Sequence, residues 1–333
     1  MMAFMSQLFS ALQDFTFESL VMPMLSALGW VSYLEEAFDF TEWFLIGLLE
    51  VLFLALVILP LERLFPAERR GPGGPGDAMR IDITYTLLHR LGAFSIFVFA
   101  VLEPAVRVVR DAWQQQGLPG IELDVALGLE YSPLLAALVY LLILDFVDYW
   151  IHRFQHRIDW WWALHAIHHS QRRMTVWSDN RNHLLDDLIR DAILAFVALL
   201  IGVAPAQYIG FVVFTRIWQS LQHANLGIAF PRWLSLLLVS PGFHRLHHSV
   251  AGGHEGPVRG MNFAVLFPMW DWVFRTADWS ADACLASGES LQPTGIKDQE
   301  HGVNYGRGFW EQQWVGVRHL VAALMPGSRK DAS

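Results

Sequence analysis

The chain has little charge and almost no cysteine. Lysine, arginine, aspartate and glutamate make up 17% of its 333 residues, whereas about 25% is usual for soluble domains. This composition argues against an ordinary soluble enzyme. The single Cys284 excludes an intramolecular disulfide and any CxxC redox or metal motif. Basic residues are also scarce, and the formal charge of −9 argues against a nucleic-acid partner, because DNA binding needs a basic face.

Apolar residues are abundant instead. They make up 54% of the chain, and 15 tryptophans and 23 phenylalanines indicate a protein solvated largely by lipid. A membrane-spanning helix needs roughly 20 mostly apolar residues, and five segments approach this: 42–61, 83–106, 132–151, 188–203 and 206–221. The last two are separated only by Ala204-Pro205, which predicts a helical hairpin. We therefore expect an all-α polytopic membrane bundle of about four to five transmembrane helices with a cytoplasmic, histidine-rich helical cap.

Arginines alternate between the loops in a way that predicts orientation. Loop 62–82 holds Arg63, Arg69, Arg70 and Arg80, and loop 152–187 holds Arg153, Arg157, Arg172, Arg173 and Arg181. The loop between the second and third segments holds only Arg107 and Arg110. Basic loops favour the cytoplasmic side. The N-terminus is therefore expected outside, and the two basic loops and the chain from about residue 222 are expected inside.

The pattern divides the chain into four parts. Residues 1–40 are apolar but interrupted by Pro23 and Gly29, which indicates an interfacial or loosely membrane-embedded segment. Residues 41–129 hold the first two transmembrane helices and their loops. Residues 130–280 form the expected catalytic domain, and 281–333 form a cytoplasmic C-terminal segment.

Ten histidines fall on the same predicted side of the membrane. They are His152, His156, His165, His168, His169, His183, His223, His244, His247 and His248. The pattern HxxxH occurs at 152–156, and HxxHH occurs at 165–169 and again at 244–248. Helical residues three and four apart share a face, so each pattern aims two or three imidazoles at one point.

An all-imidazole set indicates a transition metal. Imidazole suits Fe, Zn, Cu and Ni rather than Mg or Ca, and ten donors exceed what one four-coordinate zinc can use. Two metals with four or five imidazoles each fit the number better. Four other histidines lack the spacing and are interpreted as structural: His89, His254, His301 and His319.

These motifs resemble the fatty acid hydroxylase/sterol desaturase superfamily. The resemblance rests on DFVDYWIHRFQH (145–156), WALHAIHHS (162–170) and FHRLHHS (243–249). RNH (181–183), HAN (223–225), GMNF (260–263) and WDWVF (270–274) are also similar to segments of the family. Its extent is about residues 130–280. The sequence departs from the family after His183, where Leu184, Leu185 and Asp186 replace the proline and glutamate that commonly follow.

The resemblance implies an integral-membrane di-iron oxygenase that hydroxylates or desaturates a lipid such as a fatty acyl chain or a sterol. Its cofactors would be two Fe ions, with Zn able to substitute in purified protein, and O₂ would be the co-substrate. The chain shows no cysteine cluster and no Rossmann fingerprint. Two electrons are therefore expected from an external donor, namely a reductase, a ferredoxin or a cytochrome.

Carboxylates that flank the boxes are candidates to accept the second N–H of the ligand histidines. They are Asp145, Asp148, Asp179, Asp186 and Asp187. We single out Asp145 and Asp148, and Asp148 lies one helical turn before His152. A helix cap or a salt bridge to a nearby arginine is the alternative for Asp148. The run Trp160-Trp161-Trp162 is interpreted as an aromatic belt at the lipid headgroups.

Two other functions remain open. A histidine-rich membrane metal transporter would place its ligands along a path across the bilayer, whereas these boxes gather at one face. A zinc-dependent membrane hydrolase is disfavoured because the boxes contain no HExxH motif.

Overall fold

The computed structural model describes residues 2–69, 76–115, 122–129, 131–252 and 259–325. Regular structure within these ranges is helical, apart from two isolated bridges that join Pro66 to Leu226 and Ser249 to Thr294. The predicted all-α fold is therefore confirmed.

The N-terminal region is a series of helices that ends in a long apolar one. It comprises α1 (Met2–Thr16), η1 (Phe17–Val21), α2 (Met22–Ala27), η2 (Val31–Tyr33), α3 (Leu34–Phe53), η3 (Leu54–Ile58) and α4 (Leu59–Leu64). Val31–Leu64 is long and apolar enough to cross a membrane and contains the predicted span 42–61. The boundary expected after residue 40 falls inside α3. The N-terminal segment packs on this helix, since Gln13 donates to the Phe38 carbonyl at 3.1 Å and Phe17 contacts the Phe38 ring.

The second predicted span, 83–106, is two helices rather than one. They are α5 (Asp77–Arg90) and α6 (Ala93–Gln115), and the short α7 (Leu123–Ala126) follows them. The axis bends by 54° between α5 and α6, where Gly92 adopts a φ of +87° that residues with a Cβ rarely adopt. The bend leaves Arg90 at the end of α5, inside the protein.

Arg90 is almost fully buried because neighbouring helices supply it with acceptors. Its Nη1 donates to Glu50 Oε2 at 2.9 Å, and its Nη2 donates to Asp179 Oδ2 at 2.9 Å. A buried arginine is tolerated only when such partners are present, and removing one partner of a buried pair costs about 3–5 kcal/mol. Gly47 of α3 lies against the Arg90 carbonyl, where a Cβ has no room.

Four helices carry or frame the histidine motifs. They are α8 (Pro133–Arg157), α9 (Asp159–His169), α10 (Leu184–Leu200) and α11 (Pro205–His223). The predicted hairpin is present, with α10 and α11 joined by residues 201–204. α8 is the second helix that could cross a membrane. However, α10 has only 17 residues, about 26 Å, and is shorter than the roughly 30 Å hydrocarbon core.

The described helices thus include two that meet the length and composition of a membrane span, or three if α5 and α6 form one broken span. This number is lower than the four to five predicted. The difference arises because the sequence-based prediction accepted shorter segments, such as that of α10, as full spans.

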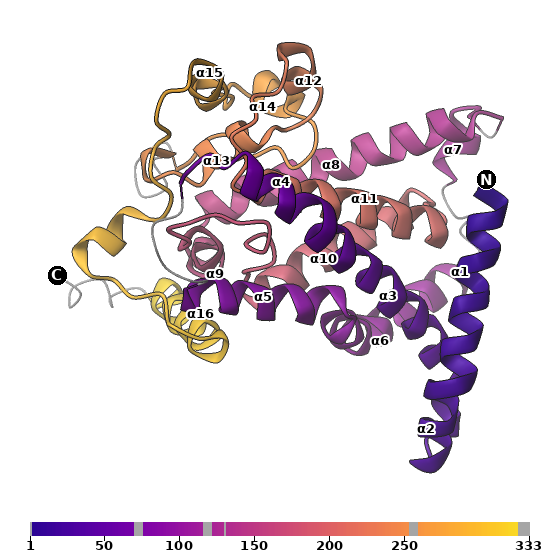
Figure 1. The fold of residues 1–333 in the computed structure, drawn as a ribbon. Helices are drawn as coiled ribbons and strands as arrows, with labels where there is room; N and C mark the ends of the chain where they lie inside the picture. Colours follow the sequence, from indigo (N-terminus) through magenta and orange to yellow (C-terminus); the bar gives the residue numbers. More distant parts are fainter. Residues whose placement is uncertain (1, 70–75, 116–121, 130, 253–258, 326–333) are drawn as a thin grey trace.

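The remaining helices are short and surround the ends of α8 and α11. They are α12 (Arg232–Leu237), α13 (Pro241–His247), η4 (Val250–Gly252), α14 (Met269–Val273), α15 (Ser280–Ser287), η5 (Lys297–His301) and α16 (Phe309–Leu324). In Figure 1, α9, α13 and α16 lie on the left, whereas α3, α8 and α11 extend to the right. The histidine-bearing helices are therefore gathered at one end of the long apolar helices.

An apolar cluster fixes this end of the molecule. Tyr149 of α8, Phe243 of α13 and Phe263 of the following loop are fully buried against Val239 and Ala264. Burying a phenylalanine side chain contributes about 1.5–3 kcal/mol. The Phe263 ring lies 6.0 Å from the ring of His152 and 5.9 Å from that of His247. The cluster therefore holds three segments distant in sequence against the histidines.

Candidate metal centre

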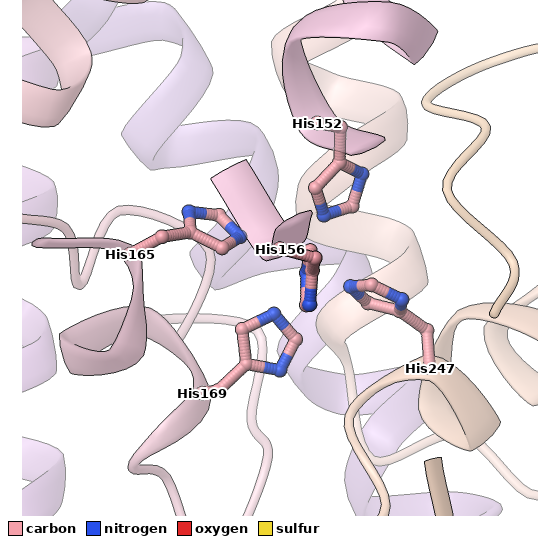
Figure 2. A group of neighbouring side chains, drawn as sticks. All are labelled: His152, His156, His165, His169 and His247. Carbon is pink, nitrogen blue, oxygen red and sulfur yellow. The ribbon is translucent and has the colours of Figure 1, made fainter. Parts of the chain in front are cut away.

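Nine of the ten predicted histidines come together in two groups. One group comprises His152, His156, His165, His169 and His247, and the other comprises His168, His223, His244 and His248. All nine are buried, and within each group the candidate ligand atoms lie within 4.8 Å of one another. Figure 2 shows the five rings of the first group, which point toward one another from α8, α9 and α13.

The HxxHH motif serves both groups at once. In 165–169, the histidines four apart, His165 and His169, join the first group, and His168 joins the second. In 244–248, the pair four apart, His244 and His248, joins the second group, and His247 joins the first. Neighbouring residues of a helix point about 100° apart, so an adjacent His-His pair faces two centres. The prediction that each motif aims at a single point is wrong in this respect.

Hydrogen bonds fix the rings of four clustered histidines. The Nδ1 of His152 lies 2.7 Å from the Phe263 carbonyl, that of His247 lies 2.6 Å from the Met261 carbonyl, and that of His223 lies 2.8 Å from the Gln219 carbonyl. A carbonyl oxygen only accepts, so each Nδ1 must carry the proton and donate it. The neutral ring then leaves the Nε2 lone pair free to bind a metal.

His165 is oriented by a carboxylate instead. Its Nδ1 donates to Asp186 Oδ2 at 2.9 Å, while its buried Nε2 makes no hydrogen bond with a described residue. The other oxygen of Asp186 accepts from Gln155 Nε2 and Trp161 Nε1, each at 2.7 Å. Asp186 is therefore held in place by α8 and α9 and fixes the direction of His165.

The second group has the spacing of a tetrahedral metal site. The Nε2 atoms of His168 and His244 lie 3.2 and 3.0 Å from the Nε2 of His223, and the Nε2 of His248 lies 3.1 Å from that of His244. Four nitrogens bound tetrahedrally at 2.0–2.1 Å would be about 3.3 Å apart. The arrangement fits a metal ion, because lone pairs that face one another repel unless a cation lies between them.

Burial keeps these imidazoles neutral. It lowers the pKa of His168, His244 and His248 well below the ordinary value, because the protonated ring loses its hydration, and neighbouring histidines lower each pKa further. A neutral ring is the form that binds a metal. The second group can therefore hold a cation at neutral pH without first releasing protons from these three rings.

His183 does not join either group. It is the N-cap of α10, where its Nδ1 accepts from Leu185 N, and its Nε2 lies 2.9 Å from the Gln313 carbonyl of α16. Gly316 brings α16 so close that a Cβ there would collide with the His183 ring. With both ring nitrogens engaged, His183 joins α10 to the C-terminal helix.

Neither Asp145 nor Asp148 contacts a clustered histidine through a hydrogen bond. Asp148 forms a two-pronged salt bridge with Arg190, at 2.7 Å to Nε and 2.5 Å to Nη2, which is the alternative left open for it. Asp145 accepts from the backbone N–H groups of Leu266 and Phe267. Its effect on the site is indirect, because it anchors the loop whose Phe263 carbonyl orients His152.

Asp186, one of the flanking aspartates that was not singled out, is the carboxylate that orients a clustered histidine. One signal was present, since Asp186 is one of two acidic residues in the first turn of α10 and lies three residues after His183. Asp179 is a second neighbour, with its Oδ1 3.6 Å from His223 Nδ1.

The aromatic belt expected at Trp160–Trp162 is not what the structure shows. Trp161 is 6% exposed and donates to Asp186. The Trp162 ring lies 5.0 Å from that of His156 and 5.5 Å from that of His169. Trp161 and Trp162 therefore form part of the wall around the histidines rather than a layer at the headgroups.

The histidines interpreted as structural stay outside both groups, as far as the chain is described. His89 is held between the Tyr85 carbonyl and Asp187, at 2.9 and 2.8 Å, and His319 packs edge-on against Tyr305. His301 lies in η5 and is exposed. His254 falls outside the described residues.

A small cavity reaches the histidines and adjoins a larger one. The small one, of about 60 Å³, is lined by five clustered histidines: His152, His165, His168, His223 and His244. The larger one, of about 300 Å³, is lined by α3, α6, α8, α10 and α11, with apolar side chains such as Phe40, Val98 and Phe211. Asp148, Arg190 and Gln219 line both. The larger cavity thus joins the apolar helices to the histidines.

Residues 137–276, which contain all nine clustered histidines, match the family model described as fatty acid hydroxylase. The family model and the curated relatives confirm the predicted resemblance of this region to the fatty acid hydroxylase/sterol desaturase superfamily. The matched region runs from the start of α8 past α14. The match therefore covers both histidine groups and the loop that orients them, as the sequence motifs predicted.

Three relatives illustrate the range of the superfamily. The chain is 27% identical to the ornithine lipid hydroxylase OlsE of Rhizobium tropici over 66% of this chain and 63% of the relative. It is 29% identical to human alkylglycerol monooxygenase over 40% of this chain and 28% of the relative. It is 27% identical to methylsterol monooxygenase 1-3 of Arabidopsis thaliana over 41% of this chain and 46% of the relative.

The chain thus spans less than two thirds of the length of each of these relatives. No solved structure matches it significantly.

Proposed function

We propose that the protein is an integral-membrane di-iron oxygenase that hydroxylates or desaturates a lipid. The observation that carries the proposal is the pair of buried all-imidazole groups at the end of an apolar cavity. The names of the relatives support it, since they describe hydroxylation or monooxygenation of lipids and sterols.

The nine clustered histidines would hold two iron ions, one in each group, and zinc could occupy the same nitrogens in purified protein. When bound, iron supplies the reductive activation of O₂ that an unactivated C–H bond requires and that no side chain provides. His183 is not part of this proposed ligand set. Because imidazole binds a metal in its neutral form, the ligand rings would not balance the metal charge, and the proximity of Asp186 and Asp179 to His165 and His223 would offset part of it.

The residues of the chain would bind the lipid, exclude water and keep the ligand rings fixed. The apolar side chains of the larger cavity give a hydrocarbon chain a path from the bilayer to the histidines. The Phe263 and Met261 carbonyls and the Asp186 carboxylate keep three ring nitrogens aimed inward. Because these acceptors are fixed before the reaction, the protein does not have to reorganise during it.

Each turnover needs two electrons from outside. Hydroxylation converts R–H, O₂, two electrons and two protons into R–OH and water, and desaturation removes two hydrogens from adjacent carbons and yields two waters. We propose an external donor, namely a reductase, a ferredoxin or a cytochrome. We also propose that the centre faces the cytoplasm, on the basis of the arginines in loops 62–82 and 152–187.

Two alternatives remain outcomes of the test. A metal transporter would need ligands spread along the spans, whereas the nine clustered histidines gather at one end of α8 and α11. A zinc hydrolase would need a carboxylate free to act as a base, whereas both oxygens of Asp186 already accept hydrogen bonds.

Lipid mass spectrometry with ¹⁸O₂ tests the proposal. Membranes with the protein and a reducing system should contain a lipid that gains one ¹⁸O atom or loses two hydrogens, and membranes with His168→Ala should not. Lipids that remain unchanged, or that take up oxygen from H₂¹⁸O instead, would contradict an oxygenase.

A further inference from the structure

The larger cavity has charged groups only at the end nearest the histidines. Its apolar part is lined by residues of α3, α6, α8, α10 and α11, of which α3 and α8 belong to candidate membrane spans. At the other end lie Asp145, Asp148, Arg190, Asp191 and Arg216. A cavity that binds only a hydrocarbon chain gains nothing from charged side chains. Charged side chains are costly to bury among membrane-spanning helices, and where they occur they mark functional sites.

Three of these charges are already satisfied. Asp148 and Arg190 neutralise each other through two hydrogen bonds. Asp145 accepts from two backbone N–H groups and from Trp270 Nε1. These groups shape the end of the cavity and have little capacity left for a ligand.

Arg216 and Asp191 are different. The guanidinium of Arg216 makes no hydrogen bond or ion pair with any residue in the described ranges, although it lines the cavity. Asp191 has one loose contact, 3.7 Å from Arg190 Nη1, and its side chain is 31% exposed. Arg90 lies close to Arg216 and donates to its backbone carbonyl. The carboxylates of Glu50 and Asp191 are near enough to act on the charge of Arg216, but neither forms a hydrogen bond or ion pair with its guanidinium.

We propose that this end of the cavity binds the headgroup of a zwitterionic amphiphile. A phosphate or carboxylate of the headgroup would accept from Arg216, and an ammonium group would donate to Asp191. The hydrocarbon chain would lie in the apolar part. Arginine suits the first role because its fork of donors matches the oxygens of phosphate and carboxylate.

Gln219 connects this subsite to the metal centre. It lines both cavities, its side chain has no hydrogen-bond partner among the described residues, and it lies one turn after Arg216. Arg216 precedes His223 by seven residues, which is about 10 Å along α11. A headgroup at Arg216 therefore places the carbons next to the headgroup, and not the end of the chain, nearest the histidines. This position of reaction rests on the proposed oxygenase function, whereas the headgroup site does not.

Binding of three probes that share one oleoyl-glycerol body tests the proposal. Oleoyl-lysophosphatidylethanolamine is zwitterionic, oleoyl-lysophosphatidic acid is anionic, and mono-oleoylglycerol is neutral. Native mass spectrometry of the full chain in a neutral detergent gives the affinities. We expect the zwitterion to bind at least about tenfold more tightly than the neutral probe, as one charge-assisted pair provides.

Variants identify the groups responsible. Arg216→Gln should bind all three probes as weakly as the neutral one, and Arg216→Lys should keep most of the preference. Asp191→Asn should weaken binding of the zwitterion but not of the anion. Arg318→Gln is the matched control, because it removes an exposed charge on α16 and should change nothing.

The proposal is overturned if wild type binds the neutral probe as tightly as the zwitterion, if Arg216→Gln keeps the preference, or if Arg318→Gln also loses it. Glycerophosphoethanolamine, which is the headgroup without its chain, should compete poorly, and equal competition would contradict an amphiphile site. The measurement needs no turnover. If no lipid takes up ¹⁸O or loses hydrogen but the zwitterionic probe still binds more tightly, only the oxygenase function is refuted. If a lipid is oxidised but the probes bind equally, only the headgroup site is refuted.

Discussion

Individual ring nitrogens have separate roles in this protein. In His152, His165, His223 and His247, Nδ1 is bound by a carbonyl or a carboxylate, and this leaves Nε2 for the centre of the group. The acceptors come from a loop, a neighbouring helix or the preceding turn of the same helix. The direction of each ring is therefore fixed by the rest of the protein.

Replacing one clustered histidine should remove metal, whereas replacing a peripheral one should not. His168→Ala deletes one of four nitrogens in the second group, so metal content and any oxygenase activity should fall. His319→Ala removes a ring that packs against Tyr305, away from both groups, and should keep the metal and the activity. Elemental analysis and the lipid assay check this, and equal metal content in the two variants would refute the ligand assignment.

Asp186 should matter although it is not a proposed ligand. Asp186→Asn puts an amide where His165 needs an acceptor, and losing such an orienting partner typically costs 10–100-fold in metal affinity or activity. Asp187→Asn is the matched control, because the carboxylate of Asp187 is next in the sequence but contacts His89 and no clustered histidine. Metal titration of both variants measures the two affinities, and that of Asp186→Asn should be the weaker. Asp186 would have no orienting role if the two affinities were the same.

At the residue scale, the sequence predicts which histidines face the metal centre better than it predicts which residues contact them. The spacing identified eight of the nine histidines that the structure gathers, because helical geometry places residues three and four apart on one face. His183 could not be judged in this way, since its contacts come from Gln313 and Gly316, some 130 residues later. Asp148 lies on the correct helix face, but Arg190 of another helix takes both of its oxygens.

Among the elements, α3 and α5 are held together by a contact that only glycine allows. A Cβ at Gly47 would collide with the Arg90 carbonyl, which is backbone and cannot move aside. Gly47→Ala should therefore push α5 away and disturb the pairs of Arg90 with Glu50 and Asp179. We expect a loss of about 1–3 kcal/mol in stability, as for other overpacked sites, measured by thermal unfolding in detergent.

Gly210→Ala is the control for this prediction. Gly210 also lies in an apolar helix, but a Cβ there meets nothing within 4 Å. Alanine favours helix over glycine by up to about 1 kcal/mol, so the melting temperature should hold or rise. A Gly47→Ala variant as stable as Gly210→Ala would show that the close contact is not needed.

The apolar pattern predicted which segments form helices, but it did not predict where the helices break or how long they are. The α10–α11 hairpin was predictable from two apolar runs separated by Ala204-Pro205. The bend between α5 and α6 was not, because it depends on how Arg90 finds Glu50, Asp179 and Ser220 on three other segments. The GMNF segment was noticed for its resemblance to the family. Only the structure shows that its backbone carbonyls accept hydrogen bonds from the histidine rings.

For the whole molecule, the main result is convergence. Segments of α8, α9, α11 and α13, up to about 100 residues apart, deliver their rings to two adjacent points. The two points are in contact, since the His169 and His248 rings, one from each group, stack at 4.3 Å. The whole arrangement lies where an apolar cavity ends, which is a geometry suited to a lipid rather than a dissolved substrate.

The most direct test of the two-centre account is the amount of metal bound per chain. Protein produced with iron supplied and purified without chelator should contain about two iron ions per chain, one for each group of histidines. A single zinc ion per chain, or no retained metal at all, would contradict the account.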